Sequence, residues 1–206
     1  MNIFRKLRWQ LTLSYTLVIL VIFDDCWNPN PKIGTQPAPK PGIHNSGWVQ
    51  SLGVEVVNRG PSAWDRLENY VLDVIGTFAD DKRILLWEMY NEPGNSANEI
   101  KSLSLLEAVF ELAHSANPTQ PLSAGIWFKN RKLNEFQLNS SDVITFHNYN
   151  SAENLQRQIV ELKTLGRPLI CTEWLALTRG CLVSTNLPVF AQEKVGCLNW
   201  GLVAGI

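Results

Sequence analysis

The sequence predicts an α/β fold with a parallel sheet, because apolar strand-like runs alternate with amphipathic helices from Leu17 onward. Strands that are separated by helices usually pair in parallel through right-handed crossovers. About six such strands are recognisable, and several of them end in acidic, amide or aromatic side chains. Both a (β/α)8 barrel and a doubly wound sheet place ligands at the carboxyl ends of their strands. No glycine-rich phosphate loop follows any of these strands, which disfavours nucleotide binding.

The predicted elements follow one another in a regular order. The predicted strands span residues 17–25, 83–93, 121–128, 142–150, 167–176 and 197–203. Apolar residues at helical spacing predict helices over residues 62–81, 100–113, 151–166 and 185–196, with a short helix or loop over 133–141. Ser62 is the expected N-cap of the first helix. Residues 26–50 form a loop rich in proline, asparagine and glycine, and its length suggests a function beyond connection.

Composition narrows the class of protein. The chain has 206 residues, of which 45% are hydrophobic and 18% are charged, as is ordinary for a globular domain with one core. The net charge of −1 gives no reason to expect a nucleic-acid partner. Eight tryptophans are a high count, and such flat side chains often line sugar sites, although they also fill cores. The four cysteines match no zinc-binding spacing, so neither a metal nor another cofactor is expected.

Residues 1–17 form an atypical N-terminal segment ahead of the predicted domain, which spans 18–206. Basic residues followed by thirteen uncharged ones resemble the start of a signal peptide, of a membrane anchor or of a bacterial sensor kinase. The apolar run is shorter than the roughly 18 residues that span a bilayer, and its end also reads as a buried strand. This segment favours an extracellular or periplasmic location, with membrane contact only if it acts as an anchor. The alternative to a leader or an anchor is that residues 10–20 form a helix that packs into the gap left by the missing strands.

Two of the predicted strands end in glutamate, at Glu92 in "LLWEMYNEP" and at Glu173 in "PLICTEWLA". Hydrolysis of a glycosidic bond requires two carboxyl groups that face one anomeric carbon, about 5 Å apart when the mechanism is retaining. Rigid strand ends can hold such groups precisely. The alternatives are a surface-turn carboxylate for Glu92 and a structural ion pair for Glu173.

The order of four short motifs carries a resemblance to a known family. "NEP" at 91–93, "FHNY" at 146–149, "TEW" at 172–174 and a last tryptophan resemble the retaining (β/α)8 glycoside hydrolases of the cellulase-like clan, in particular its family five. The resemblance covers roughly residues 18–204. It implies an incomplete TIM barrel in which strands three to eight are recognisable, while strands one and two and the arginine that strand two brings have no counterpart. A truncated gene joined to an unrelated start would explain this pattern, since a complete barrel has about 250 residues.

The resemblance also implies roles for individual residues. Glu92 would be the acid/base, which requires a raised pKa, and Glu173 the ionised nucleophile, which requires a hydrogen-bond donor such as Tyr149. The implied sugar-binding residues are Asn91, His147, Tyr149 and Trp200, joined by the loop residues Asp24, Trp27, His44 and Trp48 as candidates for neighbouring subsites. Simple packing roles remain open for His147, Trp200 and the loop residues.

The predicted function is hydrolysis of a β-linked oligo- or polysaccharide by a retaining double displacement at two glutamates. The alternative is a barrel fragment that binds carbohydrate but has lost hydrolysis. A membrane-tethered sensor is a third interpretation, and only the first twenty residues support it. Turnover of a β-glycan distinguishes the first two.

Overall fold

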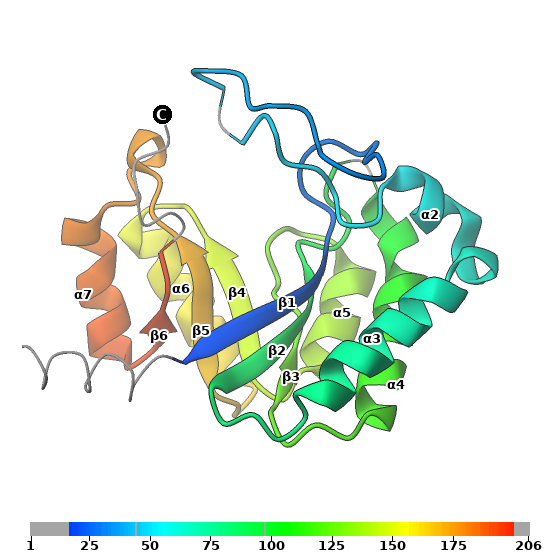
Figure 1. Cartoon of the computed structure of the whole chain (residues 1–206). Helices are drawn as coiled ribbons and strands as arrows, with labels where there is room; N and C mark the ends of the chain where they lie inside the picture. The colour runs from blue at the N-terminus through cyan, green and yellow to red at the C-terminus, as the bar shows by residue number, and fades with distance from the viewer. Residues whose placement is uncertain (1–16, 44, 97, 200–206) are drawn as a thin grey trace, which may run out of the picture.

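The computed structural model describes residues 17–43, 45–96 and 98–199 of the chain. This part of the chain contains six strands, which pair in parallel in two three-stranded sheets with the orders β1-β2-β3 and β4-β5-β6 (Figure 1). The strands are β1 (Val18–Asp24), β2 (Ile84–Asn91), β3 (Leu122–Ser123), β4 (Ile144–Asn148), β5 (Leu169–Trp174) and β6 (Gly196–Cys197). The predicted α/β class with parallel pairing is therefore confirmed.

The segment after β3 joins the two sheets. Ile126 forms an isolated parallel bridge with Phe146, and its backbone N–H donates to the carbonyl oxygen of Thr145 at 3.1 Å. The strand predicted over residues 121–128 is shorter than expected because the backbone N–H groups of Ala124 and Gly125 donate to side chains instead of to a neighbouring strand. These two residues interrupt the ladder, and the strands otherwise follow one another in chain order.

The helices are close to those predicted. They are α2 (Val54–Arg59), α3 (Asp65–Thr77), α4 (Leu103–Ser115), α5 (Arg131–Ser140), α6 (Ala152–Lys163) and α7 (Val183–Glu193), with short 3-10 turns at Gly60–Ala63, Glu99–Ser102 and Leu177–Arg179. Helix α2 was not predicted, since three of its six residues are valine, which has a low helix propensity. Ser62 is not the N-cap that was predicted, because α3 begins only at Asp65. The Ser62 hydroxyl instead donates to the carbonyl oxygen of Arg59 at 3.2 Å.

Each sheet has its own hydrophobic core on the side that the helices cover. In Figure 1, α3 and α4 flank the first sheet, whereas α6 and α7 flank the second. The first core includes Trp87 and Met89 of β2, and the second includes Phe146 and Phe190. Burying one such large side chain contributes about 1.5–3 kcal/mol. Packing against helices therefore fixes which face of each strand points inward to the site.

Glu88 lies between Trp87 and Met89 in β2, so its side chain points to the opposite face of the strand. It is 3% exposed and accepts hydrogen bonds from the backbone N–H of Gly125 and from the Thr145 hydroxyl, which lies 2.9 Å from Oε2. Burial raises the pKa of Glu88 to about 7, against the hydrogen bond from Thr145 and the charge of His147. A proton-binding group thus lies between the two sheets.

Residues 1–16 lie outside the described part of the chain, and so does most of the predicted N-terminal segment. The alternative of a helix over residues 10–20 is wrong for residues 18–20, which belong to β1. Within the described ranges, no helix combines the length and the apolar character that crossing a bilayer requires.

Candidate active site

The ends of β1 and β2 bring the first half of the site together. The register of this strand pair aligns Asp24 with Asn91, so the residues that follow each strand are neighbours in space. Glu92 follows β2 directly and has a φ of 46°, in the left-handed region that residues other than glycine seldom occupy. Such strained conformations persist where surrounding contacts fix them, and they cluster at functional sites.

Asp25 fixes the turn that carries Glu92. This carboxylate is 1% exposed and accepts hydrogen bonds from the Gly94 N–H at 2.8 Å, the Tyr90 hydroxyl at 2.8 Å and the Asn98 amide at 2.9 Å, as well as from the Ser102 hydroxyl. Burial raises the pKa of Asp25, although all four donors favour its ionised form. The turn after Glu92 is therefore tied to the end of β1 by one buried side chain.

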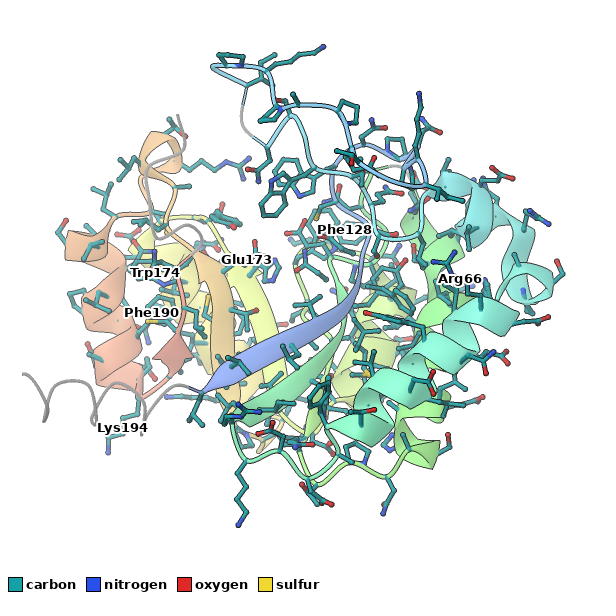
Figure 2. All side chains as sticks on the ribbon, viewed as in Figure 1. Arg66, Phe128, Glu173, Trp174, Phe190 and Lys194 are labelled. Carbon is teal, nitrogen blue, oxygen red and sulfur yellow. The ribbon has the colours of Figure 1, made fainter. Side chains whose placement is uncertain are left out.

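The second sheet supplies the facing half of the site. Its register pairs His147 of β4 with Glu173 of β5. In Figure 2, Trp174 lies beside α7 near Phe190, while Glu173 lies toward the space between the two sheets. The alternation of side chains along β5 explains this, since neighbouring residues point to opposite faces.

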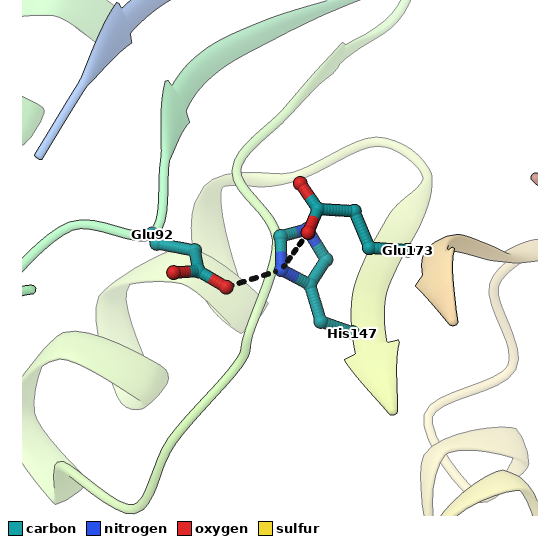
Figure 3. A group of neighbouring side chains, drawn as sticks. All are labelled: Glu92, His147 and Glu173. Carbon is teal, nitrogen blue, oxygen red and sulfur yellow. Dashed lines mark hydrogen bonds and ion pairs between the residues drawn. The ribbon is translucent and has the colours of Figure 1, made fainter. Parts of the chain in front are cut away.

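His147 lies between the two glutamates (Figure 3). Its Nδ1 atom is 2.8 Å from Oε1 of Glu92 and 3.6 Å from Oε2 of Glu173. An oxygen of each carboxyl group and a ring nitrogen of His147 all lie within 4.8 Å of one another. The structure thus brings together the two glutamates and the histidine that the sequence selected from three separate strand ends.

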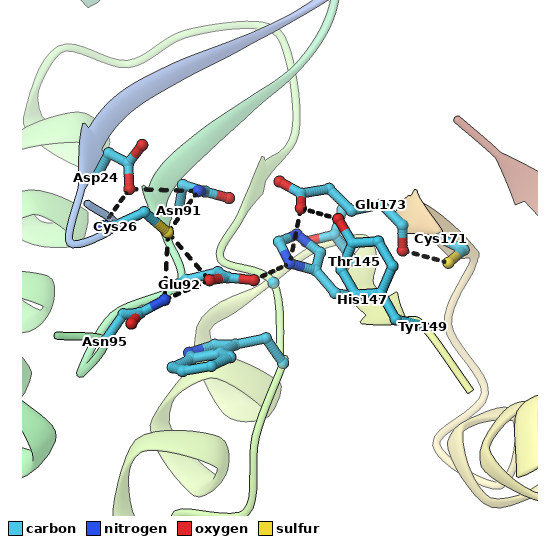
Figure 4. A network of polar contacts seen from close by, with 12 residues as sticks. Asp24, Cys26, Asn91, Glu92, Asn95, Thr145, His147, Tyr149, Cys171 and Glu173 are labelled. Atoms are coloured by element: carbon cyan, nitrogen blue, oxygen red, sulfur yellow. Dashed lines mark hydrogen bonds and ion pairs between the residues drawn. The ribbon is translucent and has the colours of Figure 1, made fainter. Parts of the chain in front are cut away.

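Glu92 accepts hydrogen bonds on both of its carboxyl oxygens (Figure 4). The Asn95 amide donates to Oε2 at 2.6 Å, the Cys26 thiol donates to the same oxygen at 3.0 Å, and His147 contacts Oε1. Burial by itself would raise the pKa of Glu92, but the bonds from His147, Cys26 and Asn95 hold it below its ordinary value. The prediction that Glu92 has a raised pKa is therefore wrong, because three hydrogen-bond donors outweigh the effect of burial.

Glu173 has fewer donors. Oε2 accepts a hydrogen bond from the Tyr149 hydroxyl at 2.6 Å, and Tyr149 is the donor that the sequence proposed for this residue. Burial and the negative charge of Glu92 raise the pKa of Glu173, against the opposing effects of His147 and Tyr149. The pKa of His147 is also raised, since its contacts with the carboxylates outweigh its burial. The imidazole thus favours its protonated form between the two acids.

The remaining predicted residues lie on the side of β1 and its loop. The Asn91 amide donates to Oδ1 of Asp24 at 3.4 Å, and the Trp27 ring meets the Trp48 ring edge-on with centroids 6.1 Å apart. Trp48 lines a hollow of about 720 Å³ whose other lining residues lie within 36–43 and 45–47 of the loop, and neither catalytic candidate lines it. His44 and Trp200 lie outside the described residues.

Sequence reasoning missed two close neighbours of Glu92. Cys26 and Asn95 both contact its Oε2 atom, and neither was assigned a role. Their positions could have indicated a role at the site, since Cys26 lies two residues beyond β1 and Asn95 lies in the turn after β2. Among the described residues, Glu92, His147 and Glu173 form the group that could hold a metal ion. An ion there would have to replace the hydrogen bond between Glu92 and His147.

The parallel sheets and the site at their strand ends are consistent with part of a TIM barrel, and comparison with solved structures finds glycoside hydrolases of that fold. The chain is similar to Bacteroides uniformis β-glucuronidase 2, with a TM-score of 0.57 and 13% identity over 68% of this chain and 22% of the other. For an endo-β-1,4-xylanase of glycoside hydrolase family 10 from Gloeophyllum trabeum, the TM-score is 0.53, with 16% identity over 72% of this chain and 59% of the other. For Faecalibacterium prausnitzii β-glucuronidase, the TM-score is 0.52, with 13% identity over 66% of this chain and 28% of the other.

This likeness shows the fold, and the chain spans between about a fifth and three fifths of the length of these three enzymes. No protein-family model and no curated protein matches the sequence. Activity and substrate therefore have to be argued from the site.

Proposed function

We propose that this protein is a glycoside hydrolase that cleaves β-linked glycans by a retaining double displacement. The observation that carries the proposal is the pair of carboxyl groups at opposed strand ends, with oxygens of Glu92 and Glu173 within 4.8 Å of each other. Retaining enzymes hold their two carboxyl groups about 5 Å apart, whereas inverting enzymes need a wider gap for a water molecule. In this proposal β1–β6 correspond to strands three to eight of a cellulase-like barrel.

Glu173 is the nucleophile and Glu92 the acid/base. In the first step, a Glu173 oxygen bonds to the anomeric carbon while the glycosidic bond breaks and the leaving oxygen takes a proton from Glu92. In the second step, Glu92 accepts a proton from water, whose oxygen bonds to the anomeric carbon and releases Glu173. Tyr149 supports the nucleophile by donating to Oε2 of Glu173. Asn91, Asp24 and Trp27 are the proposed sugar contacts.

His147 accounts for the proton that Glu92 needs. The resting pKa directions favour an ionised Glu92 and a protonated His147, and the two side chains share a 2.8 Å hydrogen bond. A proton held on Nδ1 can pass along this bond to Oε1 as the leaving oxygen of the substrate approaches. The two groups then titrate as a pair, with apparent pKa values that belong to both.

The test is hydrolysis of a panel of aryl β-glycosides, comprising glucoside, mannoside, xyloside, galactoside and glucuronide, followed by β-glucan, mannan and xylan. At least one is expected to be cleaved with retention of configuration, as followed by NMR. Glu173→Ala should lower kcat at least about 10³-fold. Added azide should then restore turnover and yield a glycosyl azide of inverted configuration. Unchanged activity in Glu173→Ala would exclude its role as nucleophile.

A carbohydrate-binding barrel without turnover is the second candidate. The ionised state favoured for Glu92 supports it, because a general acid must be protonated when the glycosidic bond breaks. This candidate predicts that calorimetry detects binding of a β-glycan while no product forms from any substrate of the panel.

A further inference from the structure

We infer that Cys26 is a positioning residue whose thiol donates a hydrogen bond to Glu92 and fixes the carboxyl group that serves as acid/base. The inference rests on the proposed function for its catalytic meaning, and the contact itself rests on geometry. Cys26 follows β1 by two residues, and its Sγ atom lies 3.0 Å from Oε2 of Glu92.

The backbone holds the thiol in place. The Cys26 N–H donates to Oδ1 of Asp24 at 2.6 Å, which closes a local turn at the end of β1. Because β1 and β2 pair with Asp24 opposite Asn91, this turn lies beside the turn that carries Glu92. The thiol is therefore placed by two strand ends that form one rigid ladder.

The surrounding amides determine which way the thiol hydrogen points. The side-chain amides of Asn95 and Asn91 lie 3.3 Å and 3.5 Å from Sγ, and each directs an N–H at the sulfur. A thiol has one hydrogen and weak acceptor capacity. Since both amides donate, the carboxylate oxygen of Glu92 is the acceptor left for the S–H group. Figure 4 shows this group of contacts around Cys26.

Cysteines in this protein that serve packing have different surroundings. Cys171 and Cys181 belong to the second hydrophobic core, and their thiols face backbone carbonyl oxygens of Glu173 and Asn148 at 3.3 Å and 3.7 Å. Cys26 is also buried, at 7% exposure, but its sulfur contacts one carboxylate and two amides. Burial and the charges of Glu92 and Asp24 raise the pKa of the Cys26 thiol, so the sulfur keeps its proton.

The hydrogen bond from the Cys26 thiol affects the pKa of Glu92. A donor to a carboxylate favours its ionised form, so the Cys26 thiol lowers the pKa of Glu92 and restrains its side chain. Cys26→Ala removes the donor, and the pKa of Glu92 should rise by about 0.5–1 unit, the size expected for one hydrogen bond. Cys26→Ser keeps a donor of similar size and should restore the value at least in part.

The experiment follows the carboxyl carbon of Glu92 by NMR in protein labelled with 13C at glutamate, with the resonance assigned by its loss in Glu92→Gln. It compares wild type, Cys26→Ala, Cys26→Ser and the control Cys197→Ser, whose residue lies in β6 and is only partly buried. The inference is supported if the Glu92 titration moves to higher pH in Cys26→Ala, moves less in Cys26→Ser and stays unchanged in Cys197→Ser. The same titration in Cys26→Ala and wild type overturns it, and so does an equal shift in Cys197→Ser.

The pH profile of kcat/KM adds the catalytic readout. The Glu92–His147 pair must hold the proton that Glu92 delivers, and loss of the thiol donor increases the affinity of Glu92 for that proton. The alkaline limb of the profile should therefore move to higher pH in Cys26→Ala, with recovery in Cys26→Ser. A wild type that hydrolyses nothing, together with a shifted Glu92 titration in Cys26→Ala, contradicts the proposed function while the thiol contact stands. An active wild type with an unmoved titration contradicts the inference alone.

Discussion

The Nδ1 atom of His147 lies 2.8 Å from Oε1 of Glu92, although 55 residues separate the two in the chain. The contact joins the end of β2 to β4 across the boundary between the two sheets. It also places the group that favours a proton next to the group proposed to deliver one.

Replacing His147 by glutamine tests whether this contact supplies the proton. The expected loss in kcat/KM is about 10²-fold or more for glycosides with poor leaving groups, which need protonation. For dinitrophenyl glycosides, whose leaving group departs without a proton, the loss should be small. His114→Gln, at an exposed position late in α4, is the matched control. Equal losses with both substrate types would mean that His147 acts only in structure.

Tyr149→Phe removes the hydroxyl that donates to Glu173 at 2.6 Å. The hydrogen bond favours the ionised nucleophile, so its removal should raise the pKa of Glu173 further. Because the nucleophile must be ionised, the acidic limb of the kcat/KM profile should move to higher pH by about 0.5–1 unit. Tyr70→Phe, on the exposed side of α3, should leave the limb in place. An unchanged acidic limb in Tyr149→Phe would show that this hydrogen bond does not control the pKa of Glu173.

Glu88 should make the folded protein less stable as pH rises. Its folded pKa of about 7 lies above the ordinary value of 4.5, so between these values the folded state binds more protons than the unfolded state. The free energy of unfolding should therefore fall from pH 4.5 to pH 7, by up to about 3 kcal/mol. Glu88→Gln should flatten this slope in urea titrations at pH 5 and pH 8, and exposed Glu68→Gln should not. An equally steep slope in Glu88→Gln would refute the assignment.

Asp25→Asn should destabilise the turn that carries Glu92. The carboxylate accepts four hydrogen bonds in a buried position, and an amide cannot accept from all four donors. The expected loss is about 2–4 kcal/mol in the free energy of unfolding, measured with urea. The exposed substitution Asp73→Asn should change stability by less than about 0.5 kcal/mol. A stability of Asp25→Asn within that range would mean that the turn does not depend on Asp25.

Local pattern determined the elements and the chemical type of the candidate residues. Apolar periodicity located β2, β4 and β5, because these strands are long and buried against helices. It failed for the short helix α2, where valines dominate. It also failed for residues 124–125, whose backbone N–H groups bond to side chains. Such exceptions depend on partners that are distant in the chain, and periodicity carries no information about them.

The sequence by itself determined that Glu92 and Glu173 end parallel strands, since the strand–helix alternation and the motif order are local properties of the chain. Only the tertiary structure decided how each carboxyl group titrates. The pKa of Glu92 depends on burial opposed by donors from Cys26 and His147, which lie 66 and 55 residues away. These donors outweigh burial, so the pKa of Glu92 is lowered and not raised as the sequence interpretation expected. Hydrogen bonds act over about 3 Å, and only folding brings these groups to that distance.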